Sequence, residues 1–384
     1  MALTAVAQVD YPNFEIVVVA DAKSMAAVRA HPLADLIKTV VYDTPNISGA
    51  RNAGIAVTAG DIVAFIDDDA VAEPSWLGHL TGPFTQADVV AVGGYVIGRN
   101  GISFQWKART VDRDAGTAEL ALDSDAPQVF TGTPDCAIKT EGTNMAVRRE
   151  ILVDIGGFDP AFEFYLDETD LNMRLGQAGL RTAIAPLARV HHGFAASGRR
   201  RADRAPTDLT QIGASIAVFL RKHGGRVDQQ DVHRQAQRVR LLKHMVAGRL
   251  YPAQVTTLLA GFDHGWAQGM ARGFGHAMPL SQPFVFQRIT PVGGTMHFVT
   301  GRVWQKRRML HQAAKDVRRG QRVTVIILSA TALFHRMRFL RTGVWFWTGG
   351  QFGKAQRSEP VFQIARMATR AKAIALRLSQ GRAS

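Results

Sequence analysis

The stretch Asp61-Ile-Val-Ala-Phe-Ile-Asp-Asp-Asp69 decides the fold class of this chain. Its run of five apolar residues predicts a short buried strand, and the β-branched run at residues 14–20 predicts a strand that is buried on both faces. The strand ends abruptly in Asp67, Asp68 and Asp69, and α/β sheets bind their ligands at the carboxyl ends of strands. We therefore expect an α/β protein with a ligand site at these three aspartates.

Strand and helix patterns alternate on both sides of this stretch. Short apolar runs predict further strands at residues 14–20, 37–42, 89–97 and 182–185, with helix-like segments between them. Alternation of this kind predicts a mostly parallel, doubly wound sheet. Residues 99–140 are mixed in character, and the pattern does not assign them to an element.

The two halves of the 384-residue chain carry opposite charge. Residues 1–192 contain 14 Lys and Arg against 25 Asp and Glu, whereas residues 193–384 contain 32 against 7. A strongly basic half needs an anionic partner, which could be phosphate, nucleic acid or a membrane surface. After a turn-rich boundary at residues 198–206, helical patterns at 209–222, 231–247, 253–261 and 361–378 predict a mainly helical basic region.

The sequence lacks the pattern of a signal peptide or of a membrane span. The longest mostly apolar run, residues 323–334, is 12 residues long, whereas a spanning helix needs about 20. The single cysteine, Cys136, excludes an intrachain disulfide and favours a reducing compartment. We expect a cytoplasmic protein, either free or peripheral on the inner face of the cell membrane.

The aspartate triplet has the chemistry of a metal site. Carboxylates are hard oxygen ligands that suit Mg²⁺ or Mn²⁺, which usually bridges them to a substrate diphosphate. An acidic turn that caps the next element is the alternative, but an uncompensated cluster of like charges is costly. His191 and His192 follow a predicted strand, and either imidazole could complete the site, although paired histidines more often fill a core or surface.

A second acidic group, Asp167, Glu168 and Asp170, opens a predicted helix. Acidic residues favour a helix N-terminus through the helix dipole, and Asp170 is spaced to pair with Arg174. That structural explanation does not require Asp167 and Glu168. Either of these carboxylates could act as a general base on a hydroxyl group.

The order of these elements resembles that of family 2 glycosyltransferases of the GT-A fold. The resemblance covers about residues 2–223 and predicts a GT-A domain at residues 1–223, followed by the basic region 224–384. The motifs that carry it are Tyr11-Pro-Asn-Phe14, Gly49-Ala-Arg-Asn-Ala-Gly54, Phe65-Ile-Asp-Asp-Asp69, Glu73-Pro-Ser-Trp-Leu77, Gly142-Thr-Asn-Met-Ala146, Gly156-Gly-Phe-Asp159, Asp167-Glu-Thr-Asp-Leu171 and the His-His pair after Val190.

The resemblance implies transfer of a sugar, with inversion, from a nucleotide-diphosphate donor to a hydroxyl of a saccharide or lipid-linked acceptor in polysaccharide synthesis. It makes Glu168 the general base, with Asp167 as the alternative, and Mg²⁺ or Mn²⁺ the cofactor. The donor-binding residues that it implies are Asp21, Arg51, Asn52, Asp67, Asp68 and Asn144. The metal ligands that it implies are Asp69, Asp67 and either His192 or His191.

The chain departs from the family pattern in three places. Glu168 stands where the family has an aspartate, and Asp21 alone remains of the usual Asp-Asp-Gly-Ser element. The family's first apolar strand, central in its sheet, has no match, which would leave unpaired backbone on both neighbouring strands. A catalytically inactive scaffold of a polysaccharide assembly complex at the membrane surface is therefore the alternative function. The basic half has no nucleic-acid-binding motif, so no nucleic-acid partner is expected.

Overall fold

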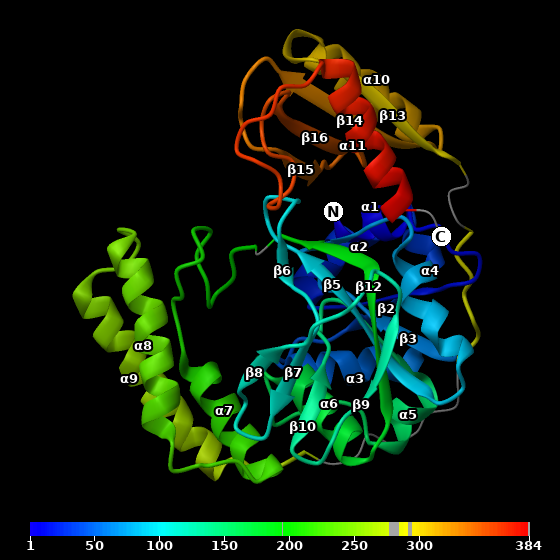
Figure 1. The fold of residues 1–384 in the computed structure, drawn as a ribbon. Helices are drawn as coiled ribbons and strands as arrows, with labels where there is room; N and C mark the ends of the chain where they lie inside the picture. Colours follow the sequence, from blue (N-terminus) through cyan, green and yellow to red (C-terminus); the bar gives the residue numbers. More distant parts are fainter. Residues whose placement is uncertain (194, 276–283, 291–293, 383–384) are drawn as a thin grey trace.

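The computed structural model describes residues 1–193, 195–275, 284–290 and 294–382, and it shows an α/β protein in three parts (Figure 1). A first α/β unit occupies the lower centre of Figure 1, and a second lies above it. The helices α8 (Gln230–Val246) and α9 (Pro252–Ala271) extend to one side. The predicted α/β class is confirmed.

The main sheet of the first unit is mixed, which corrects the prediction of a mostly parallel sheet. Among the described strands of this sheet, β5 and β12 form the one parallel pair. Two consecutive parallel strands need a crossover connection, which is usually a helix. Between β5 and β11, the described residues 98–144 contain strands and no helix, and β11 lies antiparallel to both of its neighbours, β3 and β5. The order is β3 (Ile62–Phe65), β11 (Met145–Arg148), β5 (Val89–Ile97), β12 (Arg181–His192), β4 (Ala70–Ala72), with β6 (Phe104–Trp106) beside β5 and β9 (Gln128–Thr131) beside β12.

Strands β1 (Ile16–Ala20) and β2 (Ile37–Val41) form a separate, parallel two-stranded sheet. Within the described part of the chain, β1 pairs with β2 alone and β3 with β11 alone, so each has an edge without a ladder partner. The resemblance to the family predicts open edges of this kind. Val17, Val18 and Val19 are half-buried, so the predicted burial of this strand on both faces is wrong for most of its length.

Helices cover both faces of the main sheet. Val92 of β5 packs in one core with Trp76 and Leu80 of α4 (Trp76–Thr81). Val90, on the same strand, packs in a second core with Leu171 of α6 (Asp167–Gln177). The sheet and α6 therefore form one rigid frame for the acidic groups at its edge.

Helices α7 (Thr210–His223) and α9 pack closely and share the core of the first unit. A side chain at Gly265 would meet the backbone oxygen of Thr210 at 1.8 Å, so only glycine permits this approach. Phe219 of α7 and Phe262 of α9 lie in one cluster with Met173 of α6. The division into residues 1–223 and 224–384 stays a prediction, and α9 packs across it.

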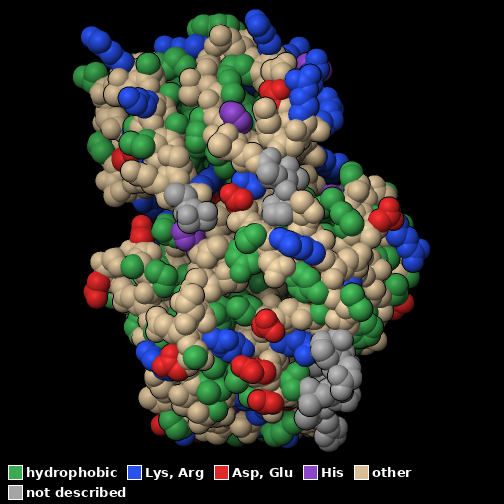
Figure 2. All heavy atoms as spheres, turned by 90° about the vertical axis from the view of Figure 1, so that its right-hand side faces the viewer, with side chains coloured by type: hydrophobic (Ala, Val, Ile, Leu, Met, Phe, Trp, Pro, Cys, Tyr) green, Lys and Arg blue, Asp and Glu red, His purple; other side chains and the backbone are tan. Residues whose placement is uncertain are grey.

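The second α/β unit contains a sheet that the sequence analysis did not predict. The order is β13 (Met296–Arg302), β14 (Arg322–Ser329), β16 (Trp345–Gly350), β15 (Arg336–Phe339), and all pairs are parallel except β15 with β16. The helices predicted at 209–222, 231–247 and 253–261 are confirmed by α7, α8 and α9, whereas the helix predicted at 361–378 begins only at Met367 as α11 (Met367–Gly381). Helix α11 and helix α10 (Lys306–Arg318), which was not predicted, pack on this sheet. Figure 2 shows the acidic side chains gathered mainly on the lower unit, whereas blue side chains dominate the upper one.

None of the described helices combines the length and the apolar character that crossing a bilayer requires.

A buried ion pair joins the two α/β units. Arg382, beyond α11, lies 3.4 Å from Glu73 and stacks on Trp345 of the second unit. His191 of β12 contacts the other oxygen of Glu73 at 2.8 Å. Burial alone would raise the pKa of Glu73, but Arg382 and His191 together lower that pKa to about 2. The Glu73 carboxylate is therefore ionised, and it links the two units through its contacts with Arg382 and His191.

Replacing Glu73 by glutamine should lower the free energy of unfolding by about 3 kcal/mol at neutral pH, because it leaves the Arg382 charge buried and unpaired. The carboxylate has a lowered pKa in the folded state, so its contribution is present above its unfolded pKa and is lost as the pH falls toward about 2. Urea unfolding between about pH 7 and pH 3 should show wild type and variant converge in acid. Glu119→Gln, at an exposed position, is the control; equal losses in both variants would contradict the prediction.

Candidate active site

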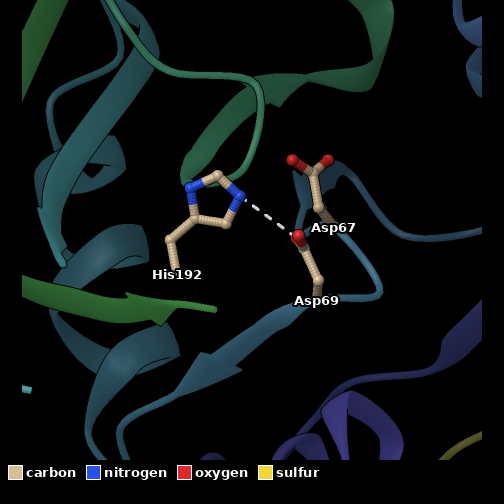
Figure 3. Close-up of side chains that lie close together, drawn as sticks. All are labelled: Asp67, Asp69 and His192. Carbon is tan, nitrogen blue, oxygen red and sulfur yellow. Dashed lines mark ion pairs between the residues drawn. The ribbon is translucent and has the colours of Figure 1, made fainter. Parts of the chain in front are cut away.

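Strand register brings two aspartates and a histidine together. Asp67 and Asp69 lie between β3 and β4, and β12 pairs antiparallel with β4 so that His192 is opposite Ala70. The His192 Nε2 atom lies 3.1 Å from Asp69 Oδ1 (Figure 3). One ligand atom from each of Asp67, Asp69 and His192 lies within 4.8 Å of the others. Two carboxylates and an imidazole at this spacing fit a divalent cation.

The second acidic group lies at the start of α6, and Arg51 connects it to the first. The Arg51 guanidinium lies 3.4 Å from Asp67 Oδ1 through Nη2, and its Nη1 forms an ion pair with Asp167. Arg51 projects from α3 (Ile47–Val57) and lies against the rings of Phe65 and Phe158. Since one side chain touches both groups, the aspartates after β3 and the carboxylates of α6 belong to one site.

Glu168 is held by Lys139, which the sequence analysis did not single out. The Lys139 ammonium lies 2.8 Å from Glu168 Oε1 and donates to Thr169 Oγ1, also at 2.8 Å. Lys139 ends β10 (Cys136–Lys139), where a buried lysine in an apolar strand is the signal that could have identified it. Glu141, two residues later, is buried and pairs with Arg109.

The two adjacent carboxylates of α6 have opposite pKa shifts. Burial raises the pKa of Asp167, and the charge of Glu168 raises it further, against the lowering effect of Arg51. Burial would also raise the pKa of Glu168, but Lys139, through its charge and its hydrogen bond, lowers that pKa well below the usual range. Asp170, by contrast, is a structural residue, and its predicted pairing with Arg174 is confirmed at 2.9 Å.

Two predicted donor-binding residues have structural contacts instead. Asn144 is fully buried; its amide donates to the oxygens of Tyr95 and Ala188 and accepts from the Trp76 indole at 2.7 Å. Asn52 exchanges hydrogen bonds of 2.7 and 2.8 Å with the backbone of Phe158. These contacts engage the polar atoms of both amides, and a role of either residue in donor binding stays a prediction.

The three remaining predicted residues, Asp68, Asp21 and His191, are not part of the candidate metal group. Asp68 is the exposed neighbour of this group; partial desolvation of its carboxyl and the charges of Asp69 and Asp67 raise its pKa. Asp21 is exposed and caps α2 (Ala22–Arg29), accepting from Ser24 N at 2.6 Å. His191 faces Glu73 and Trp345 because adjacent strand residues point to opposite faces, so the structure does not bring it to the metal group.

Replacing Asn144 by alanine should lower the free energy of unfolding by about 2–5 kcal/mol, because three buried polar groups lose their partner. Chemical denaturation measures the loss. Asp21→Ala, which removes an exposed helix cap, should cost about 1 kcal/mol. An Asn144→Ala protein of normal stability but weakened nucleotide binding would contradict the structural role.

Comparison with known proteins finds relatives of the first unit. Residues 2–155 match the model of the family described as glycosyl transferase family 2. A glucosyl-dolichyl phosphate glucuronosyltransferase of Haloferax volcanii is 29% identical over 154 residues, which cover 39% of this chain and 47% of the relative.

Other relatives match over shorter shares of their own lengths. The O-antigen biosynthesis protein RfbC of Myxococcus xanthus is 26% identical over 219 residues, 52% of this chain and 16% of RfbC. An N-acetylglucosaminyl-diphospho-decaprenol L-rhamnosyltransferase of Mycobacterium tuberculosis is 39% identical over 86 residues, 22% of this chain and 27% of the relative. The chain thus spans less than half of each of these relatives.

Solved structures resemble the fold at low identity. TarS of S. aureus in complex with UDP has a TM-score of 0.38 and 15% identity, covering 58% of this chain and 60% of TarS. GalNAc-T7 with UDP, GalNAc and Mn²⁺ has a TM-score of 0.37 and 17% identity, covering 46% of this chain and 37% of GalNAc-T7.

Proposed function

We propose that this protein transfers a sugar from a nucleotide-diphosphate donor to a hydroxyl of a lipid-linked or saccharide acceptor, with inversion at the anomeric carbon. The observation that supports the proposal best is the contact of Arg51 with both Asp67 of the candidate metal group and Asp167, the neighbour of the candidate base Glu168. The names of two relatives, which act on a dolichyl phosphate and a decaprenyl diphosphate derivative, support a lipid-linked acceptor.

Three residues supply the cation site of this mechanism. Asp67, Asp69 and His192 would hold Mg²⁺ or Mn²⁺, which, when bound, stabilises the negative charge of the diphosphate leaving group. Arg200 lies 3.6 Å from Asp69 and adds a fixed positive charge at the same place. Preorganised charges of this kind stabilise the transition state at no cost of reorganisation.

Glu168 is the proposed general base. Its side chain is 16% exposed, whereas that of Asp167 is 3% exposed, so an acceptor hydroxyl reaches Glu168 more readily. Lys139 keeps the Glu168 carboxylate ionised and therefore able to accept the hydroxyl proton as the oxygen attacks the sugar. Arg51 holds Asp167 and the donor side in position.

The test of this function is the release of nucleoside diphosphate from UDP-, GDP- and dTDP-sugars with Mn²⁺, compared with the same reactions in EDTA. We expect release from one donor class, and only with the metal. Release that persists in EDTA would overturn the metal role.

A catalytically inactive scaffold is the second candidate, and the open edges of β1 and β3 favour it. A protein that binds a donor but turns over none of these sugars, with or without Mn²⁺, would support the scaffold.

A further inference from the structure

A cationic cavity lies next to the candidate active site. It has a volume of about 360 Å³ and lies between the loop of residues 197–206 and the end of α8. Arg201 of this loop donates to the backbone oxygen of Arg249 at 3.0 Å, which fixes the two walls together. Figure 1 shows α8 with the loop that precedes α7 at its side. The lining residues are Arg200, Arg204, Arg240, Lys243, His244 and Arg249.

Two side chains connect this cavity to the catalytic groups. Arg200 lines the cavity and lies 3.6 Å from Asp69 of the candidate metal group. Tyr165, two residues before Asp167, is close enough to both Glu168 and Arg240 to interact with their charges. The cavity is therefore next to Asp69 through Arg200, and Arg240 in its lining is within electrostatic range of Tyr165.

The cations of the cavity repel one another. Burial lowers the pKa of Arg240, Tyr165 acts in the opposite direction, and the charge of Arg200 lowers that pKa further. Burial likewise lowers the pKa of His244, with added repulsion from Arg240 and Arg249, against a weaker attraction to Asp203. Asp203 itself pairs with Arg201 at 2.7 Å. A group of like charges that line one cavity is typical of a site that a multiply charged anion completes.

An apolar cavity adjoins the cationic one on the surface of α8. It has a volume of about 370 Å³ and is lined by Val239, Leu242, Lys243 and Val246, so that Lys243 borders both cavities. Val239 is 44% exposed and Val246 is 86% exposed. Val232, seven residues before Val239, continues this apolar stripe along α8. Charge and apolar surface thus adjoin, which matches an amphipathic anion.

We propose that these two cavities bind the lipid-linked acceptor, with its phosphate or diphosphate among the cations and its hydrocarbon chain along the valine stripe of α8 (Val232, Val239 and Val246). The proposal rests on the proposed glycosyltransferase function. A guanidinium group can donate two parallel hydrogen bonds to phosphate oxygens. The exposed apolar stripe beside the cations suits the hydrocarbon chain of the lipid. A sugar attached to that phosphate would extend past Tyr165 and the exposed ring of Phe164 toward Glu168.

The test measures binding of geranylgeranyl diphosphate and of inorganic pyrophosphate to the whole chain, in EDTA so that no metal bridges either probe to Asp67 and Asp69. Wild type should bind the prenyl probe more tightly than pyrophosphate. Arg240→Gln with Lys243→Gln should weaken both probes at least about tenfold. Val239→Ser with Val246→Ser should weaken the prenyl probe alone, by about fivefold or more. Arg307→Gln with Arg308→Gln, which removes the same charge from exposed positions on α10, should change neither.

Other outcomes would overturn the proposal in distinguishable ways. Unchanged prenyl diphosphate binding in the Arg240 and Lys243 double variant overturns it. Equal affinity for the two probes, unaffected by the valine changes, indicates a site for free phosphate instead. If the Arg240 and Lys243 double variant no longer binds phosphatidylcholine vesicles with about 30% phosphatidylglycerol, but still binds the prenyl probe with wild-type affinity, the cations form a membrane contact instead.

The release of nucleoside diphosphate by the wild-type protein distinguishes a failure of this proposal from a failure of the proposed function. A chain that releases nucleoside diphosphate but binds no prenyl diphosphate overturns the acceptor site alone. A chain that binds the prenyl probe through Arg240 and Lys243 but turns over no donor keeps the anion site and overturns the transferase function.

Discussion

Replacing Glu168 by glutamine should lower the rate of sugar transfer by about 10²–10⁴-fold, with little change in donor binding. Glutamine has the same shape, so its side-chain oxygen still accepts from Lys139 and Thr169, but it cannot take a proton from the acceptor. The measurement is single-turnover transfer at saturating donor, together with the dissociation constant of the nucleoside diphosphate.

The Asp167→Asn variant is the matched comparison, because the neighbouring carboxylate contacts Arg51 and is nearly fully buried. We expect a smaller loss there. The pH dependence separates the two assignments: the pKa of Glu168 is lowered to about 2, so a rate that depends on its ionised form should be flat above about pH 4. Burial raises the pKa of Asp167 to about 7, so a rate that depends on its ionised form should rise through neutral pH. If the wild-type rate rises in this way and transfer is lost in Asp167→Asn, Asp167 is the base.

The sequence predicted the parts of the site whose chemistry is local. The aspartates after β3 and the pair Asp167 and Glu168 each stand at an element end, where an uncompensated charge signals function. Arg51 contacts both groups, and this contact depends on the packing of α3 against the sheet, which no local sequence pattern encodes. For Lys139, the lysine in an apolar strand is a local signal, but its pairing with Glu168 follows from the position of β10 beside α6.

Asparagine is ambiguous in a sequence, because an amide binds a ligand and a backbone equally well. Asn144 and Asn52 lie in motifs of the family, but their neighbours in space, Trp76 and Phe158, come from distant parts of the chain. The sheet of the second unit was missed for a related reason. Strand β15 alternates exposed and buried positions over only four residues, and the seven residues of β13 include a single buried position, so neither gives a strong strand pattern.

Replacing Asp69 by alanine should reduce metal-dependent release of nucleoside diphosphate by about 10²–10³-fold, because a cation ligand is worth several kcal/mol of transition-state stabilisation. Asp69 Oδ2 also accepts from the backbone of Ala195 at 2.8 Å, and its carboxylate faces His192 and Arg200. Alanine removes all of these contacts, so part of its effect could come from the loop after β12.

Asp69→Asn separates the two causes. The amide oxygen of asparagine still accepts from Ala195, but it is a neutral and weaker ligand, so the loss should remain near that of alanine if Asp69 binds the cation. Asp68→Asn removes the same charge from the exposed neighbour outside the metal group, and its loss should be much smaller. Titration of Mn²⁺ into each protein should follow the same order, with binding weakened in both Asp69 variants. Full Mn²⁺ affinity in Asp69→Asn would mean that the Asp69 carboxylate does not bind the cation. Equal losses in Asp68→Asn and Asp69→Asn would mean that the cluster acts through its charge and not as a set of ligands.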